Sequence, residues 1–211
     1  MKPIKLIINA DDLGAGMTIN NAIFDLMARG QVTSATILAN GPAFDDAVTR
    51  AKDFPACSFG VHLNVMEYKP LTSNPDLAPL LDSDRHFAAR LFDIKLNSRV
   101  KRAIRKEWSA QIEKVRSACI NISHLDSHFH AHTHPGLFLT LKAVQKAHKI
   151  GRVRLTKNVY DVDAPVDNNF LRFKKRLWNM GLRRYIATGT TSGFTEFSTF
   201  LAIASRTTLR H

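Results

Sequence analysis

The chain has few cysteines and no long apolar segment. Cys57 and Cys119 are its only cysteines, which rules out a cysteine-ligated zinc site. Each lies in an apolar, strand-like context, so we expect two buried, reduced thiols rather than a disulfide. No run approaches the roughly 20 apolar residues that cross a bilayer, and the amino terminus lacks a cleavage pattern. We therefore expect a cytoplasmic protein.

Acidic residues are scarce relative to basic ones. The chain carries 30 Lys and Arg against 18 Asp and Glu, a formal net charge of +12. Residues 142–184 alone hold twelve Lys or Arg against three Asp. This segment is compatible with a polyanion partner or a peripheral membrane contact, although such charge is more often a solvated helix face. No DNA-binding motif or stacked-aromatic pattern accompanies it, so we expect no specific nucleic-acid partner.

Repeats and low-complexity segments are also absent, which leaves a single compact domain over residues 1–211 as the expectation. Apolar runs typical of strands and amphipathic runs typical of helices alternate along the chain. Strands are predicted at 5–9, 32–38, 57–64, up to 126, and at 153–155, and helices at 17–29, 43–52, 99–118, 136–148 and 169–187. This alternation predicts an α/β fold with a parallel sheet or barrel.

Polar side chains follow several of the predicted strands. Asp11 and Asp12 come after the first strand, His62 and Asn64 end the third, and His128 follows a later one. Ligands of parallel β/α folds bind at the carboxyl ends of strands, where successive loops converge. We therefore expect these sequence-distant groups to meet in one site.

Five of the nine histidines fall within residues 124–134. Side chains of an extended segment alternate between its two faces, so the even-numbered residues of this run could share one side. These are His124, Asp126, His128, His130, His132 and His134. A surface loop is the alternative, but so dense a set of imidazoles favours a divalent metal site.

Asp12, His62 and His128 would supply one carboxylate oxygen and two imidazole nitrogens, a set that leaves coordination positions open. Asp11 could act as the base that takes a proton from water. Two simpler interpretations stay open, since Asp12 could cap the next helix and His62 could be a hydrogen-bonded core residue. The combination at three strand ends instead favours metal-assisted hydrolysis of an acyl bond.

Ordered motifs along the chain resemble those of the YdjC-like carbohydrate deacetylase family, which includes chitooligosaccharide deacetylases and the hopanoid-biosynthesis deacetylase. The motifs are NADDLG at 9–14, VTSAT at 32–36 with NGPAF at 40–44, GVHLN at 60–64, KPLT at 69–72 and HLDSH at 124–128. The resemblance runs from the first strand to about Phe194. It implies a (β/α) barrel-like fold and hydrolysis of an N-acetyl group from an amino sugar.

By motif, the resemblance assigns Asp11 as the general base and Asp12, His62 and His128 as metal ligands. Magnesium and zinc both occur in the family, and the nitrogen-rich set suits zinc better. Weaker candidates for substrate binding or for orienting the ligands are Asn64, Asp126, His130 and His132.

The chain departs from the family pattern near its end. Family members continue to a late strand with a His-Pro pair, whose histidine is thought to protonate the leaving amine. Here TSGF at 191–194 matches the preceding stretch, no His-Pro follows, and His211 lacks that context. Truncation, completion by a partner subunit, or replacement by a histidine of the loop would each account for this. We favour truncation, which predicts a barrel lacking its last strands, weak activity and an open edge that a homodimer could cover.

The sequence thus predicts a metal-dependent carbohydrate N-deacetylase, with one zinc or magnesium ion, acting on a soluble or lipid-linked N-acetylated amino sugar. Two alternatives remain, which are another metal-dependent hydrolase such as a phosphoesterase and a non-catalytic protein that binds polyanions or membranes.

Overall fold

The computed structural model describes residues 6–156, 169–185, 189–191 and 193–196. It divides into two compact units, Met1–Ile150 and Gly151–His211. The elements of the first unit are β1 (Asn9–Leu13), α1 (Met17–Ala28), β2 (Ser34–Ile37), α2 (Phe44–Ala51), β3 (Ser58–Leu63), α3 (Ser98–Ser117), β4 (Ile122–Ser127) and α4 (Phe138–His148), with short 3-10 turns at Pro75–Leu80, His128–Thr133 and Pro135–Leu137. The described helix of the second unit is α5 (Asn169–Arg184). The single domain expected over 1–211 stays a prediction.

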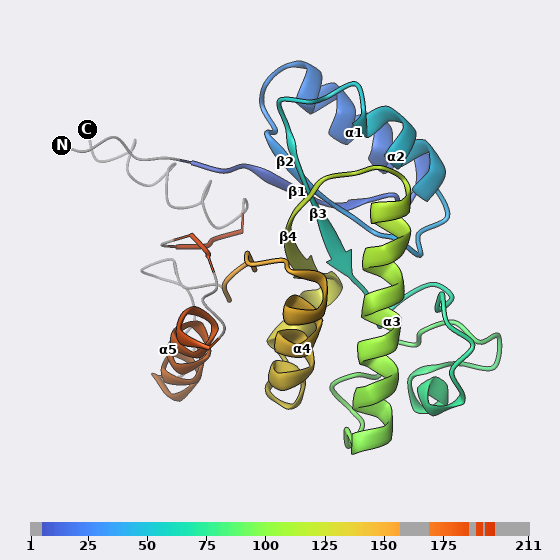
Figure 1. Cartoon of the computed structure of the whole chain (residues 1–211), viewed down its shortest axis with the longest axis vertical. Coiled ribbons are helices and arrows are strands. Elements are labelled where there is room, and N and C mark those ends of the chain that lie inside the picture. Colours follow the sequence, from blue (N-terminus) through green and yellow to red (C-terminus); the bar gives the residue numbers. More distant parts are fainter. Residues whose placement is uncertain (1–5, 157–168, 186–188, 192, 197–211) are drawn as a thin grey trace. The chain divides into compact units, whose positions relative to one another are not determined.

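Strands β1 to β4 pair in parallel and in chain order. A helix follows each strand, and right-handed crossovers between sequential neighbours bring the helices to the same face of the sheet. This is the arrangement of (β/α) barrels, whereas a doubly wound sheet reverses its strand order. Helix α1 packs beside α2, and α3 beside α4 (Figure 1). The predicted α/β class with a barrel-like parallel sheet is confirmed.

Most predicted boundaries agree with the structure to within a few residues, and two differ. The first strand was expected at residues 5–9, yet β1 begins at Asn9, because its partners on β2 start at Ser34. The two aspartates therefore lie within the strand rather than in a turn behind it. At the strand expected at 153–155, the described residues form a bridge between Arg152 and Gly189 and no strand. The last residues of the helix expected at 169–187 lie outside the described ones.

Helix α3 covers the sheet with the apolar stripe that its sequence predicts. Val100, Ile104, Trp108, Ile112 and Val115 are all buried, at helical spacing along one face. Burial of each such side chain contributes about 1.5–3 kcal/mol. Asn97 begins the helix by accepting hydrogen bonds from the first backbone N–H groups.

Both cysteines are free thiols, but the expectation that they are buried is wrong. Cys119 is exposed in the turn after α3, with a left-handed φ of 64°, and Cys57 is partly exposed just before β3. Their apolar neighbours enter the core, whereas the cysteines themselves lie outside the strands.

Gly41 allows the loop after β2 to approach the loop after β1. A Cβ at Gly41 would lie 2.3 Å from the Gly14 carbonyl oxygen, while a Cβ at Gly16 would meet nothing within 4 Å. Because the obstacle is backbone, we expect Gly41→Ala to destabilise the protein by about 1–3 kcal/mol. Gly16→Ala is the matched control and should change the free energy of unfolding by less than about 1 kcal/mol. Urea denaturation of both variants measures the difference, and equal stabilities would contradict this packing argument.

Candidate active site

A bulge in β1 presents Asp11 and Asp12 to the site. Ala10 pairs with Ala35 and Leu13 with Ile37, so β1 carries one residue more than β2 over this stretch, and Asp12 has a left-handed φ of 64°. Neighbouring side chains of a regular strand point to opposite faces, and a bulge re-aims them. This explains how two consecutive carboxylates both lie near His62.

His62 and Asp126 occupy paired positions on β3 and β4. The His62 Nδ1 lies 2.6 Å from the Asp126 Oδ1, and the Thr36 hydroxyl donates to the Asp126 Oδ2 at 3.1 Å. All three residues are buried, with His62 only 2% exposed. The imidazole is therefore held in one orientation, with its Nε2 directed toward β1.

His128 reaches the site from the turn that follows β4. The expected extended run of histidines on one side is wrong, because the chain turns after Ser127 and both Phe129 and His130 have left-handed backbones, with φ of 48° and 54°. The six even-numbered positions from 124 to 134 cannot share a face across such a kink. His128 alone of these histidines joins the cluster formed by Asp12 and His62.

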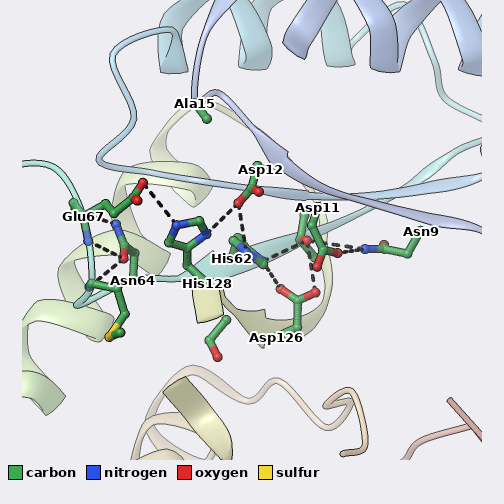
Figure 2. Close-up of polar contacts among 12 residues, drawn as sticks. Asn9, Asp11, Asp12, Ala15, His62, Asn64, Glu67, Asp126 and His128 are labelled. Atoms are coloured by element: carbon green, nitrogen blue, oxygen red, sulfur yellow. Dashed lines mark hydrogen bonds and ion pairs between the residues drawn. The ribbon is translucent and has the colours of Figure 1, made fainter. Parts of the chain in front are cut away.

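The imidazoles of His62 and His128 both lie close to the same carboxylate oxygen of Asp12 (Figure 2). The Asp12 Oδ1 lies 3.1 Å from the His62 Nε2 and 2.8 Å from the His128 Nδ1. Zinc bonds of about 2.0–2.2 Å would place ligand atoms roughly 3.3 Å apart, so a small opening of this cluster would fit a metal ion. A second group, Asp11, His62 and Asp126, also has ligand atoms within 4.8 Å of one another.

The carboxylates make this point attractive to a cation. Burial alone would lower the pKa of His62, but the charge of Asp126 and hydrogen bonds with Asp12 and Asp126 raise it to about 10. Burial alone would raise the pKa of Asp12, yet hydrogen bonds and charges from His128 and His62 hold it below its ordinary range. The same negative charge that favours an imidazolium favours a metal ion.

The remaining histidines of the run lie apart from this cluster. His132 is fully buried, and its Nδ1 lies 2.6 Å from the Ser127 hydroxyl, which also accepts a hydrogen bond from the His132 backbone. His134 accepts a hydrogen bond from the Gly136 backbone. The His124 Nδ1 is 2.8 Å from the Ser123 hydroxyl, and its ring covers Gly60.

His132 and His134 stabilise the turns between β4 and α4 and do not join the candidate metal ligands. His132 ties the turn back to the end of β4, and His134 caps the short helical turn that precedes α4. His130 is partly exposed, and its carbonyl oxygen accepts a hydrogen bond from Thr133.

Asn64 organises the loop after β3. Its side-chain oxygen accepts from the backbone N–H groups of Met66 and Glu67, and its amide donates to the Glu67 carbonyl and to Asn40. Gln111 of α3 bonds both backbone groups of Asn64. The amide that the sequence suggests for substrate contact is thus engaged in shaping the loop.

The sequence did not point to Glu107 as a structural residue, although its side chain anchors the KPLT segment at residues 69–72. Its buried carboxylate accepts hydrogen bonds from the Leu71 and Thr72 backbones at 2.9 Å, from the Thr72 hydroxyl at 2.7 Å and from Gln111 at 2.9 Å. A detectable signal existed, because an acidic residue beside Trp108 interrupts the apolar stripe of α3. Buried charges of this kind must be satisfied by partners.

We expect Glu107→Ala to destabilise the protein by at least about 2 kcal/mol, because charged hydrogen bonds contribute about 1.5–3 kcal/mol each. Glu113 of the same helix is more than half exposed and pairs with Arg116 at the surface, so Glu113→Ala should cost less than about 1 kcal/mol. Chemical denaturation of both variants provides the measurement. If the two were equally stable, Glu107 would not anchor the loop.

Comparison with known proteins shows the family to which the chain belongs. The profile of the YdjC-like protein family matches residues 5–209. The chain belongs to this family. Proteins named carbohydrate deacetylase are similar to it: one from Brevibacillus brevis is 35% identical over 144 residues, covering 68% of this chain and 56% of that protein. One from Listeria monocytogenes serotype 4a is 38% identical over 132 residues, covering 59% and 51% respectively.

The chain spans 56–58% of the length of the first curated relatives that it matches. A crystal structure of a proposed cellobiose-phosphate cleavage protein from Enterococcus faecalis has the same fold, with a TM-score of 0.72 and 23% identity over 95% of this chain and 74% of that one. Three of the quoted motifs contribute to the clusters around His62, namely NADDLG through Asp11 and Asp12, GVHLN through His62 itself, and HLDSH through Asp126 and His128.

Contacts with other molecules were also expected from the sequence. No described helix is long and apolar enough to cross a membrane. Helix α5 carries basic residues together with exposed apolar ones such as Phe170, Phe173 and Leu177. A cytoplasmic location, peripheral membrane contact and a homodimer stay predictions.

Proposed function

We propose that this chain carries the metal site and the base of a carbohydrate N-deacetylase, in which Asp12, His62 and His128 hold a divalent cation. The convergence of both imidazoles on the Asp12 Oδ1 carries this proposal, and the relatives named carbohydrate deacetylase support its substrate class. The substrate is an N-acetylated amino sugar, and its products are acetate and the free amine.

A bound cation would supply Lewis acidity, which polarises the acetamide carbonyl and lowers the pKa of water. The chain's own residues divide the remaining work. Asp126 holds the His62 ring through Nδ1, so that Nε2 stays directed into the site. Asp11 accepts a hydrogen bond from the Asn9 amide at 2.8 Å and serves as the base that removes a proton from the attacking water.

Parallel release assays test this function. The purified chain, loaded separately with zinc or magnesium, is incubated with a panel of N-acetylated sugars and a panel of phosphate esters. We expect acetate release from the first panel and no phosphate release from the second. Phosphate release alone would support the phosphoesterase alternative, and no release from either panel would argue for a non-catalytic protein.

A further inference from the structure

The two ring nitrogens of His128 face different carboxylates. Its Nδ1 lies 2.8 Å from the Asp12 Oδ1, and its Nε2 lies 3.3 Å from the Glu67 Oε2 (Figure 2). The Nε2 atom is buried, and the described residues offer it no well-aligned hydrogen bond. Glu67 is thus the acceptor best placed for this nitrogen, and a small rotation of its carboxylate, which is 45% exposed, would align the contact.

The main chain of Glu67 is fixed independently of its side chain. Its carbonyl oxygen accepts hydrogen bonds from the Asn40 amide at 3.1 Å and the Asn64 amide at 2.7 Å, and its N–H donates to the Asn64 Oδ1 at 3.2 Å. Tyr68, the next residue, has a φ of 63°, a conformation that is unfavourable for a bulky side chain and occurs where the surroundings enforce it. The loop is therefore built to hold position 67 against the site.

We propose that Glu67 is a positioning residue of the metal site, which accepts a hydrogen bond from the His128 Nε2–H and leaves Nδ1 to bind the metal. A neutral imidazole carries one proton, and the partner of one nitrogen decides which nitrogen keeps a free lone pair. Asp126 plays the same part for His62, where Nδ1 faces the Asp126 carboxylate and Nε2 faces Asp12. The inference rests on the metal-binding part of the proposed function.

Three variants test this role. Glu67→Ala removes the acceptor, Glu67→Gln keeps an oxygen that can accept from Nε2–H, and Asp84→Asn removes an exposed carboxylate elsewhere in the same loop. Because the loop holds Glu67 through main-chain atoms, both Glu67 variants should keep their fold, which circular dichroism checks. The readouts are the zinc dissociation constant from calorimetry and the ring ¹⁵N chemical shifts of His128 in the zinc-loaded protein.

We expect the wild-type shifts to show Nδ1 bound to zinc and Nε2 protonated. Zinc affinity should fall about 10- to 100-fold in Glu67→Ala, fall less in Glu67→Gln and stay unchanged in Asp84→Asn. Zinc bound through Nε2, or wild-type affinity in Glu67→Ala, would overturn the role of Glu67 and leave the proposed function standing. A wild-type chain that binds no zinc or other divalent ion would overturn both.

Discussion

Replacing His128 with alanine is expected to abolish metal uptake and to reduce acetate release to background. The variant removes one of the three proposed ligands, and the remaining pair of Asp12 and His62 would leave a metal ion mostly hydrated. Metal content of the purified protein, measured by mass spectrometry, and acetate release from an N-acetylated sugar are the two readouts.

His134→Ala is the matched control for this variant. His134 belongs to the same histidine-rich segment, but its Nδ1 accepts a backbone hydrogen bond and its ring lies beside Phe92, away from the cluster. We expect this control to keep its metal and its activity. Stoichiometric metal in His128→Ala would show that His128 is not a ligand.

Asp11→Asn is expected to separate catalysis from metal binding. If Asp11 is the base, its amide replacement should keep the metal and lower kcat by about 10²- to 10⁴-fold, the usual contribution of general base catalysis. The substitution preserves size, and the side-chain oxygen can still accept the hydrogen bond from Asn9. Metal analysis and steady-state kinetics on the same preparation provide the measurement.

The second cluster of Asp11, His62 and Asp126 makes the metal analysis of this variant informative. Loss of metal in Asp11→Asn would indicate that the ion binds between these three residues instead. Asp25→Asn, which removes an exposed carboxylate paired with Arg29 on α1, controls for the change in charge and should behave like the wild type.

The order of strands and helices was predictable because each element carries a complete local pattern. The stripe from Val100 to Val115 specifies α3 and the face that it buries, and the positions of Asp12, His62 and His128 at strand ends predict that they meet. These side chains meet because parallel pairing brings the carboxyl ends of successive strands to one edge of the sheet.

What the sequence did not predict depends on non-local pairing and on backbone conformation. The bulge at Asp11 and Asp12 follows from the register between β1 and β2, which no local pattern encodes. The left-handed turn at Phe129 and His130 is equally hidden, because neither residue type demands a positive φ. Glu67 reaches His128 only through a loop of non-repeating structure that Asn64 shapes.

The decisive measurement is acetate release from N-acetylated chitobiose, followed before and after removal of the metal by a chelator. We expect that the purified, metal-loaded chain releases acetate, that chelation abolishes the release, and that added zinc or magnesium restores it. Release that persists unchanged in the demonstrably metal-free chain would show that deacetylation does not depend on a metal.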